Sequence, residues 1–297
     1  GRVVRGVVLE LAGLIDPALA AWIEDHGAFP ATMVDRIVPA TTAADLDRLE
    51  AMAGYRDESP VMHEPFRQWV IEDDFVDAAR PDLGAVGAQL VGDVTPFEHM
   101  KLRMLNGTHS SLAYLGYLAG HETIADTVAD PAFADFLRGL WRHEIIPALT
   151  PPPGVDLGDY ADALLARYAN PAIRHRTWQI AMDGSQKLPQ RILGTIAEVR
   201  AAGGTVPGLT LAVAAWMRYV SGRDQSGRPI EVKDPMAARL AALWRDDPAE
   251  TVAGFLALAE VFPPALRDDP GFAADLTAAL SGLIRDGVQA SLKRASQ

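Results

Sequence analysis

The chain has 297 residues and no cysteine, carries a net charge of −12, and is 49% apolar. This length and apolar content predict one large or two ordinary domains with a sizeable core, and the missing cysteines exclude disulfides and thiolate metal sites. The acidic balance argues against nucleic acid or an anionic membrane as main partner, and no apolar run approaches the roughly 18 residues that span a bilayer. We expect a cytoplasmic protein with a small-molecule ligand.

Residues 1–94 mix helix and strand patterns. VVLELAGLI predicts a helix, and Asp16-Pro17 begins another that runs to Gly27. The β-branched run TMVDRIVPA, which ends at Pro39, and the later QWVIED predict two strands. TAADLDRLEAMAG between them predicts a short capped helix that closes on Gly54. Such alternation is typical of an α/β domain.

Residues 95–297 are almost wholly helical in pattern. Asp-Pro pairs, a triple proline at 151–153 and a glycine pair at 203–204 separate the helical segments. TLAVAAWMRYV is apolar nearly all round, which predicts a buried helix. The sequence therefore predicts a second, mainly α domain over residues 95–297.

The segment TPFEHMKLRMLNGTH opens this second domain and carries its densest chemistry. Its first residue, Thr95, is the predicted helix cap. At about 100° per residue, Glu98, Asn106 and His109 fall within about 140° of Lys101. One face then combines an amine, a carboxylate, an amide and an imidazole, which suits metal-free proton transfer at a hydroxyl or carbonyl carbon. A solvated polar face with a satisfied histidine has the same spacing.

A second polar segment, IRHRTWQIAMDGSQKLPQR, contains a basic cluster around a predicted Asp-Gly-Ser turn. Arg174, His175 and Lys187 belong to it and are our candidate substrate-binding residues. Cationic side chains at a helix junction suit a carboxylate or polyhydroxylated ligand. Salt bridges between helices of an acidic protein are the alternative explanation.

Asp35 lies inside the apolar strand pattern FPATMVDRIVPATT. A carboxylate at this place either lines a cleft at a strand end or is paired internally. The sequence offers no further chemistry, because no G-x-S-x-G elbow is present and the other histidines lack metal-ligand spacing. Those histidines are His26, His63, His99, His121 and His143.

These three segments together resemble the mannitol dehydrogenase family, the long-chain polyol and sugar-acid dehydrogenases. FPATMVDRIVPATT resembles the V-D-R-I signature of the family, and KLRMLNGTH resembles its K-x-x-x-x-N-x-x-H catalytic signature. The resemblance continues through HSSLAYLGYLAGH, YANPAIRHRTWQIAMDGSQKLPQR and AAWMRYVSG. Within the family, HRTWQIAMDGSQKLPQR is most similar to fructuronate reductases (mannonate oxidoreductases), with mannitol 2-dehydrogenase as the near neighbour.

The resemblance implies a metal-independent oxidoreductase that uses NAD, with NADP not excluded, and acts as a monomer or homodimer. Its reaction would interconvert a sugar acid or polyol and its keto form, with fructuronate/mannonate first and mannitol 2-dehydrogenase-type oxidation as the alternative. Lys101 would be the general acid/base, Asn106 and His109 would bind the reacting oxygen, and Glu98 would relay protons. Asp35 would lie at the cleft near the cofactor and substrate, as a cofactor-binding residue.

The chain departs from the family pattern at its N-terminal end, where no G-x-G-x-x-G or P-loop occurs. By resemblance, a glycine-rich phosphate turn should precede Gly1, in a part on the order of 150–200 residues long. We therefore expect residues 1–94 to be the remnant of an α/β (Rossmann-type) dinucleotide-binding domain, followed by a mainly α C-terminal domain. A catalytically inert helical fragment is the competing hypothesis.

Overall fold

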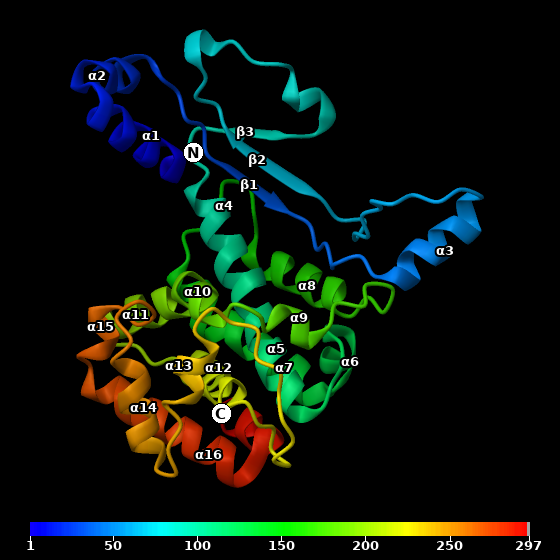
Figure 1. Ribbon diagram of the computed structural model, residues 1–297, viewed down its shortest axis with the longest axis vertical. Coiled ribbons are helices and arrows are strands. Elements are labelled where there is room, and N and C mark those ends of the chain that lie inside the picture. The colour runs from blue at the N-terminus through cyan, green and yellow to red at the C-terminus, as the bar shows by residue number, and fades with distance from the viewer. Residues whose placement is uncertain (296–297) are drawn as a thin grey trace. The chain divides into compact units, whose positions relative to one another are not determined.

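The computed structural model describes residues 1–295, which form two compact units that divide after His99. The first unit contains a small three-stranded sheet, and every element that the structure describes from residue 100 to residue 295 is a helix (Figure 1). This confirms the predicted fold class of a small α/β part followed by a mainly α part. Within residues 1–295, no helix combines the length and apolar character that crossing a bilayer requires.

The first unit is built on a sheet of strand order β1-β2-β3, in which β1 and β2 are antiparallel and β2 and β3 are parallel. Its elements are α1 (Arg2–Ile15), α2 (Pro17–His26), β1 (Thr32–Asp35), α3 (Ala43–Ala53), β2 (Gln68–Glu72), the 3₁₀ turns η1 (Val76–Ala78) and η2 (Leu83–Val86), and β3 (Gln89–Val91). The local signals for the helices are confirmed. Asp16 caps α2 through the Ala18 amide, and α3 ends at Gly54 with φ of 77°.

The strand predicted to reach Pro39 is shorter than the sequence pattern indicates. β1 ends at Asp35, and the backbone then leaves the ladder, because the Ile37 amide donates to the Glu64 carboxylate at 2.6 Å. The Glu64 amide in turn donates to the Ile37 carbonyl at 3.2 Å. The side chain and the backbone of Glu64 thus bond Ile37 in place of a neighbouring strand.

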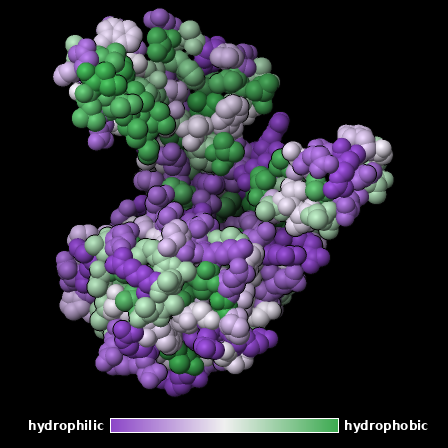
Figure 2. Space-filling model, in the orientation of Figure 1, coloured by the Kyte–Doolittle hydropathy of each residue, from purple (hydrophilic) through white to green (hydrophobic). Residues whose placement is uncertain are grey.

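An exposed apolar face covers α1 and α2 in the first unit. Only Ala12 of α1 is buried, whereas Val7, Leu11 and Leu14 of α1 and Trp22 of α2 are exposed. Figure 2 shows this patch as a continuous apolar area over the two helices. An apolar area of this kind is uncommon on a monomeric protein surface.

The second unit is organised around α12 (Pro207–Val220), which packs against α5 (Thr108–Ala119) and α16 (Pro270–Ala295). Nearly all of α12 is buried, which confirms the prediction from TLAVAAWMRYV. The other helices of this unit are η3 (Lys101–Gly107), α6 (Ile124–Ala129), α7 (Pro131–Gly139), η4 (Leu140–Ile145), η5 (Ile146–Ala148), α8 (Leu157–Tyr168), α9 (Thr177–Ile180), α10 (Gly184–Leu188), η6 (Pro189–Leu193), α11 (Gly194–Ala201), α13 (Ala237–Ala241), α14 (Pro248–Leu256) and α15 (Pro264–Arg267). The remaining helix, α4 (Thr95–Met100), spans the division between the units.

Three of these helices, η3, η4 and η6, are π-helices. Their hydrogen bonds run from residue i to residue i+5, so the turn is wider than an α-helical turn, and such turns often occur at functional sites. η3 packs against both η4 and η6. The widest backbone turns of the second unit therefore lie together.

Candidate active site

The segment that carries Lys101, Asn106 and His109 is not the regular α-helix assumed in the sequence analysis. η3 is a π-helix from Lys101 to Gly107, and α5 continues the chain from Thr108. Bonding between residues i and i+5 brings residues five apart nearly into line. Lys101 and Asn106 are five apart, so they lie closer to one face than an α-helical wheel predicts.

The predicted cap of this segment is also wrong in detail. The Thr95 hydroxyl accepts a hydrogen bond from Arg2 at 2.6 Å, and the capping acceptor is Asp93, whose carboxylate bonds the Thr95 amide at 2.9 Å. Asp93 precedes the Thr-Pro pair that marked the helix start. An acidic side chain at the N-terminus suits the positive end of the helix dipole.

The wide turn leaves carbonyl groups displaced from their α-helical partners, and side chains bond to them. The Met104 carbonyl accepts from the Trp141 indole at 3.0 Å and from the Thr108 hydroxyl at 2.5 Å. The Leu105 carbonyl accepts from the Tyr168 hydroxyl at 2.8 Å. All these groups are buried, so the bonds prevent the free-energy cost of unpaired polar groups.

A glycine permits η3 and η6 to touch. A Cβ atom placed on Gly107 would lie 2.6 Å from the Arg191 carbonyl oxygen, closer than real Cβ contacts. The same residue, Arg191, donates from its guanidinium to the Ser110 hydroxyl at 3.1 Å. The backbone and the side chain of Arg191 therefore both contact the segment that follows Lys101.

His109 is buried against two other rings. It stacks on Tyr168 with centroids 5.2 Å apart and meets the edge of His175 at 4.7 Å. Among residues 1–295, the Nε2 atom of His109 and the Nδ1 atom of His175 have no hydrogen-bond partner although both atoms are buried. Buried polar atoms without a protein partner are uncommon, which singles out these two neighbouring nitrogens as candidate hydrogen-bonding atoms.

Burial and neighbouring cations keep both imidazoles neutral. Burial lowers the pKa of His109 well below its usual value, and His175, Arg191, Arg167 and Lys101 lower it further. Burial, and then Lys187, lower the pKa of His175 to about 4. A neutral imidazole carries one donor and one acceptor nitrogen, so His109 can offer a hydrogen bond to an oxygen without bringing a charge.

The basic cluster predicted at residues 173–191 is divided by the structure. Lys187 lies near the imidazoles, where its ammonium donates to the Met182 carbonyl at 2.6 Å and where burial, followed by Arg191, lowers its pKa. Arg174 instead points to solvent, with its guanidinium 3.7 Å from Glu122. His175 and Lys187 thus join the group around His109, whereas the contacts of Arg174 fit the salt-bridge alternative.

The other two candidate residues, Glu98 and Asp35, belong to the first unit. Glu98 lies in the first turn of α4, 3.5 Å from the Arg2 guanidinium. Asp35 ends β1 and its side chain is fully buried. Asp35 thus lies at a strand end, and its complete burial is also consistent with the internally paired carboxylate that the sequence analysis gave as the alternative.

Two residues that the sequence analysis did not single out contact the candidate site. Tyr168 contacts both the π-turn and His109, and Trp141 contacts the π-turn. Both are aromatic residues in apolar helical patterns, where packing alone explains their presence. No signal in the sequence separates them from other core aromatic residues.

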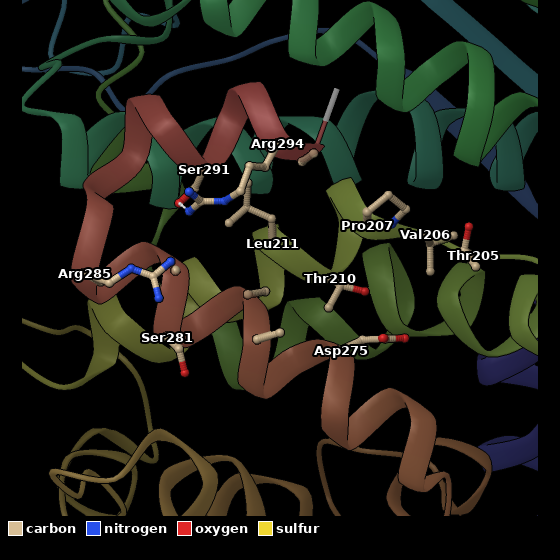
Figure 3. Close-up of a pocket in the computed structure, with 14 residues that line it drawn as sticks. Thr205, Val206, Pro207, Thr210, Leu211, Asp275, Ser281, Arg285, Ser291 and Arg294 are labelled. Atoms are coloured by element: carbon tan, nitrogen blue, oxygen red, sulfur yellow. Dashed lines mark hydrogen bonds between the residues drawn. The ribbon is translucent and has the colours of Figure 1, made fainter. Parts of the chain in front are cut away.

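A cavity of about 550 Å³ lies elsewhere in the second unit, between the start of α12 and the bent helix α16 (Figure 3). Thr210, Asp275, Arg285 and Arg294 line it, but none of the candidate catalytic residues does. Its two arginines are paired with Asp286. Within residues 1–295, no group of three His, Cys, Asp or Glu side chains could hold a metal ion.

Comparison with known proteins identifies the class of the chain. Residues 1–85 match the mannitol dehydrogenase Rossmann domain, and residues 93–284 match the mannitol dehydrogenase C-terminal domain. The chain therefore belongs to the mannitol dehydrogenase family.

Particular relatives cover nearly the whole chain. D-mannonate oxidoreductase of Escherichia coli (strain K12) is 50% identical over 97% of this chain and 60% of its own length. Mannitol 2-dehydrogenase of Phaeosphaeria nodorum is 40% identical over 98% of this chain and 51% of its own length. The solved structure of Pseudomonas fluorescens mannitol 2-dehydrogenase, a ternary complex with NAD and D-mannitol, superposes with a TM-score of 0.92 at 38% identity and covers 99% of this chain and 59% of that one. The chain thus spans at most about 60% of the length of these relatives.

Proposed function

We propose that this chain carries the acid–base and substrate-binding residues of an NAD-dependent oxidoreductase that interconverts a sugar acid and its keto form, with fructuronate/mannonate as the pair. The observation behind this is the group formed by Lys101, Asn106 and the buried, neutral His109 on one π-helical turn and the start of α5. The 50% identity to D-mannonate oxidoreductase supports the choice of substrate. Oxidation of a polyol, as in mannitol 2-dehydrogenase, is the second candidate, supported by the fit to that structure.

The chain's own residues would act on the oxygen of the reacting carbon. Bound NAD(H) supplies or accepts the hydride. In ketone reduction, Lys101 donates a proton to the oxygen, and in alcohol oxidation it removes the hydroxyl proton. Asn106 and His109 donate hydrogen bonds to the same oxygen and stabilise its developing negative charge. The unpartnered Nε2 atom of His109 is the donor position that this role requires.

Residues 1–99 contain no glycine-rich turn that could bring backbone amides to the pyrophosphate of the cofactor. We propose that Asp35 and Glu98 serve the cofactor side and the proton path of the same reaction. Their support is the family membership together with the place of Asp35 at the end of β1.

The charged groups near His109 favour an anionic substrate. Lys187 and Arg191 are both half-buried, and burial lowers the pKa of each. Desolvated cations are stabilised by an anion that enters beside them, and a guanidinium matches a carboxylate geometrically. A sugar acid supplies such a carboxylate and a polyol does not.

Replacement of Lys101 tests the proposal. The assay uses the protein that carries this chain together with a whole dinucleotide-binding domain, with fructuronate and NADH as substrates. Lys101→Met should lower turnover at least about a hundredfold, as loss of a general acid/base does, and leave the affinity for NADH unchanged. Lys293→Met, at an exposed lysine of α16, is the matched control and should retain wild-type turnover. Turnover of Lys101→Met within about threefold of wild type would refute the assignment.

A further inference from the structure

Three aromatic rings form a column that ends at the candidate catalytic histidine. Trp141 of η4 stacks on Tyr168 at 6.4 Å with an interplanar angle of 21°, and Tyr168 stacks on His109 at 5.2 Å and 22°. All three rings are buried. The face of the His109 ring in α5 is therefore packed against Tyr168 of α8, which is in turn packed against Trp141 of η4.

The same two aromatic residues hold the backbone of the π-turn. Trp141 donates to the Met104 carbonyl and Tyr168 donates to the Leu105 carbonyl, the two residues that directly precede Asn106. The Thr108 hydroxyl lies 3.0 Å from the Tyr168 hydroxyl and links this contact to the start of α5. Side chains that bond to these carbonyls favour the wide turn over a regular α-helix, in which the same groups would bond within the helix.

We propose that Tyr168 and Trp141 are positioning residues, which hold the π-turn open and fix the plane of the His109 ring, so that Lys101, Asn106 and His109 converge on one oxygen. This inference rests on the proposed function and deepens it. Tyr168 makes both contacts at once, through its hydroxyl to Leu105 and through its ring face to His109. Misplacement of reacting groups by about 1 Å can cost about a hundredfold in rate, so the position of this turn matters for turnover.

Tyr168→Phe removes the hydroxyl and keeps the ring. Hydrogen–deuterium exchange on the 297-residue chain should show exchange in residues 101–109 faster by about tenfold, the effect of losing one buried hydrogen bond, with α12 unchanged. Turnover of the protein with its whole dinucleotide-binding domain should fall by about tenfold or more, with the KM for NADH unchanged. Trp141→Phe removes the other donor and should give the same local effect. Tyr55→Phe, at an exposed tyrosine of the first unit, is the matched control and should change neither readout.

The results separate this inference from the proposed function. Unchanged exchange at residues 101–109 in both variants would overturn it. Faster exchange there with turnover within about twofold of wild type would also overturn it, because the turn would then not position the reaction. Wild-type turnover in Lys101→Met is a different result, which refutes the proposed function while the exchange measurement still reports on the turn.

Discussion

Replacing His175 by glutamine should remove a specific part of the pH dependence of stability. Burial, and then Lys187, lower the pKa of His175 to about 4, whereas an unfolded histidine titrates near 6.5. Between these values the unfolded state binds more protons at this site than the native state does. The free energy of unfolding therefore falls as the pH falls through this window, and the contribution of His175 is complete only above about pH 6.5.

The size of this effect follows from the two pKa values. A shift from 6.5 to about 4 corresponds to about 3 kcal/mol when the pH lies below both values. Lowering the pH only from 7.5 to 5 should cost the wild-type protein about 2 kcal/mol at His175. The lowered pKa of His109 adds to this loss, whereas the raised pKa of Glu144 acts in the opposite direction over the same change of pH. The difference between wild type and variant reports the part that belongs to His175, together with the effect of His175 on the pKa of His109.

Urea denaturation followed by circular dichroism at 222 nm, at pH 7.5 and pH 5, measures the difference. The stability of His175→Gln should decrease by about 2 kcal/mol less than that of wild type over this change of pH. His143→Gln, at an exposed histidine of η4, is the control and should keep the wild-type pH dependence. If His175→Gln kept it as well, the argument that the fold holds this imidazole neutral would be refuted.

Three further predictions concern packing, a buried acid and the exposed face. Gly107→Ala should lower the free energy of unfolding by about 1–3 kcal/mol, because the new Cβ would lie 2.6 Å from the Arg191 carbonyl oxygen. Gly139→Ala is the control, since no atom lies within 4 Å of the Cβ that it adds. An equal loss of stability in both variants would contradict the prediction. Burial raises the pKa of Glu144 to about 7, although its carboxylate accepts hydrogen bonds from the Leu209 and Gly208 amides, which act in the opposite direction. The native state therefore binds more protons than the unfolded state between pH 4.5 and 7, and the free energy of unfolding should fall as the pH rises through this window. Glu144→Gln should remove this slope in the same denaturation assay. The 297-residue chain should self-associate through α1, and Leu11→Glu should lower its mass in light scattering, whereas a monomeric wild-type chain would count against the prediction.

The helices were predictable because their ends depend on short-range chemistry. Asp16 before Pro17 caps α2, and Gly54 closes α3 in the left-handed conformation. The sheet was only partly predictable. β3 has three residues, and its parallel pairing with β2 depends on residues well separated along the chain. The short apolar pattern of β3 does not indicate which strand β3 pairs with.

The candidate site was predictable in its residue types but not in its backbone. The sequence analysis brought Lys101, Asn106 and His109 to one face from an α-helical wheel, which assumes a single hydrogen-bond pattern. The actual turn accepts hydrogen bonds from Trp141 and Tyr168, which are distant in sequence. The same limit explains Arg174 and Lys187, because neighbours outside their own segment decide which of the two is buried.

The π-turn also has a consequence for the length of the segment. A turn closed between residues i and i+5 contains one residue more than an α-helical turn, so η3 acts as a one-residue insertion in an otherwise regular helix. Deleting a single residue between Lys101 and Gly107 would let the backbone return to α-helical bonding and would keep α5 in register, because the wide turn already takes up the extra residue. The wide turn would then close, and the Met104 and Leu105 carbonyls would leave the positions in which they accept hydrogen bonds from Trp141 and Tyr168. The wide turn thus requires its extra residue, and the number of residues between Lys101 and Gly107 is as much a part of the candidate site as their identities.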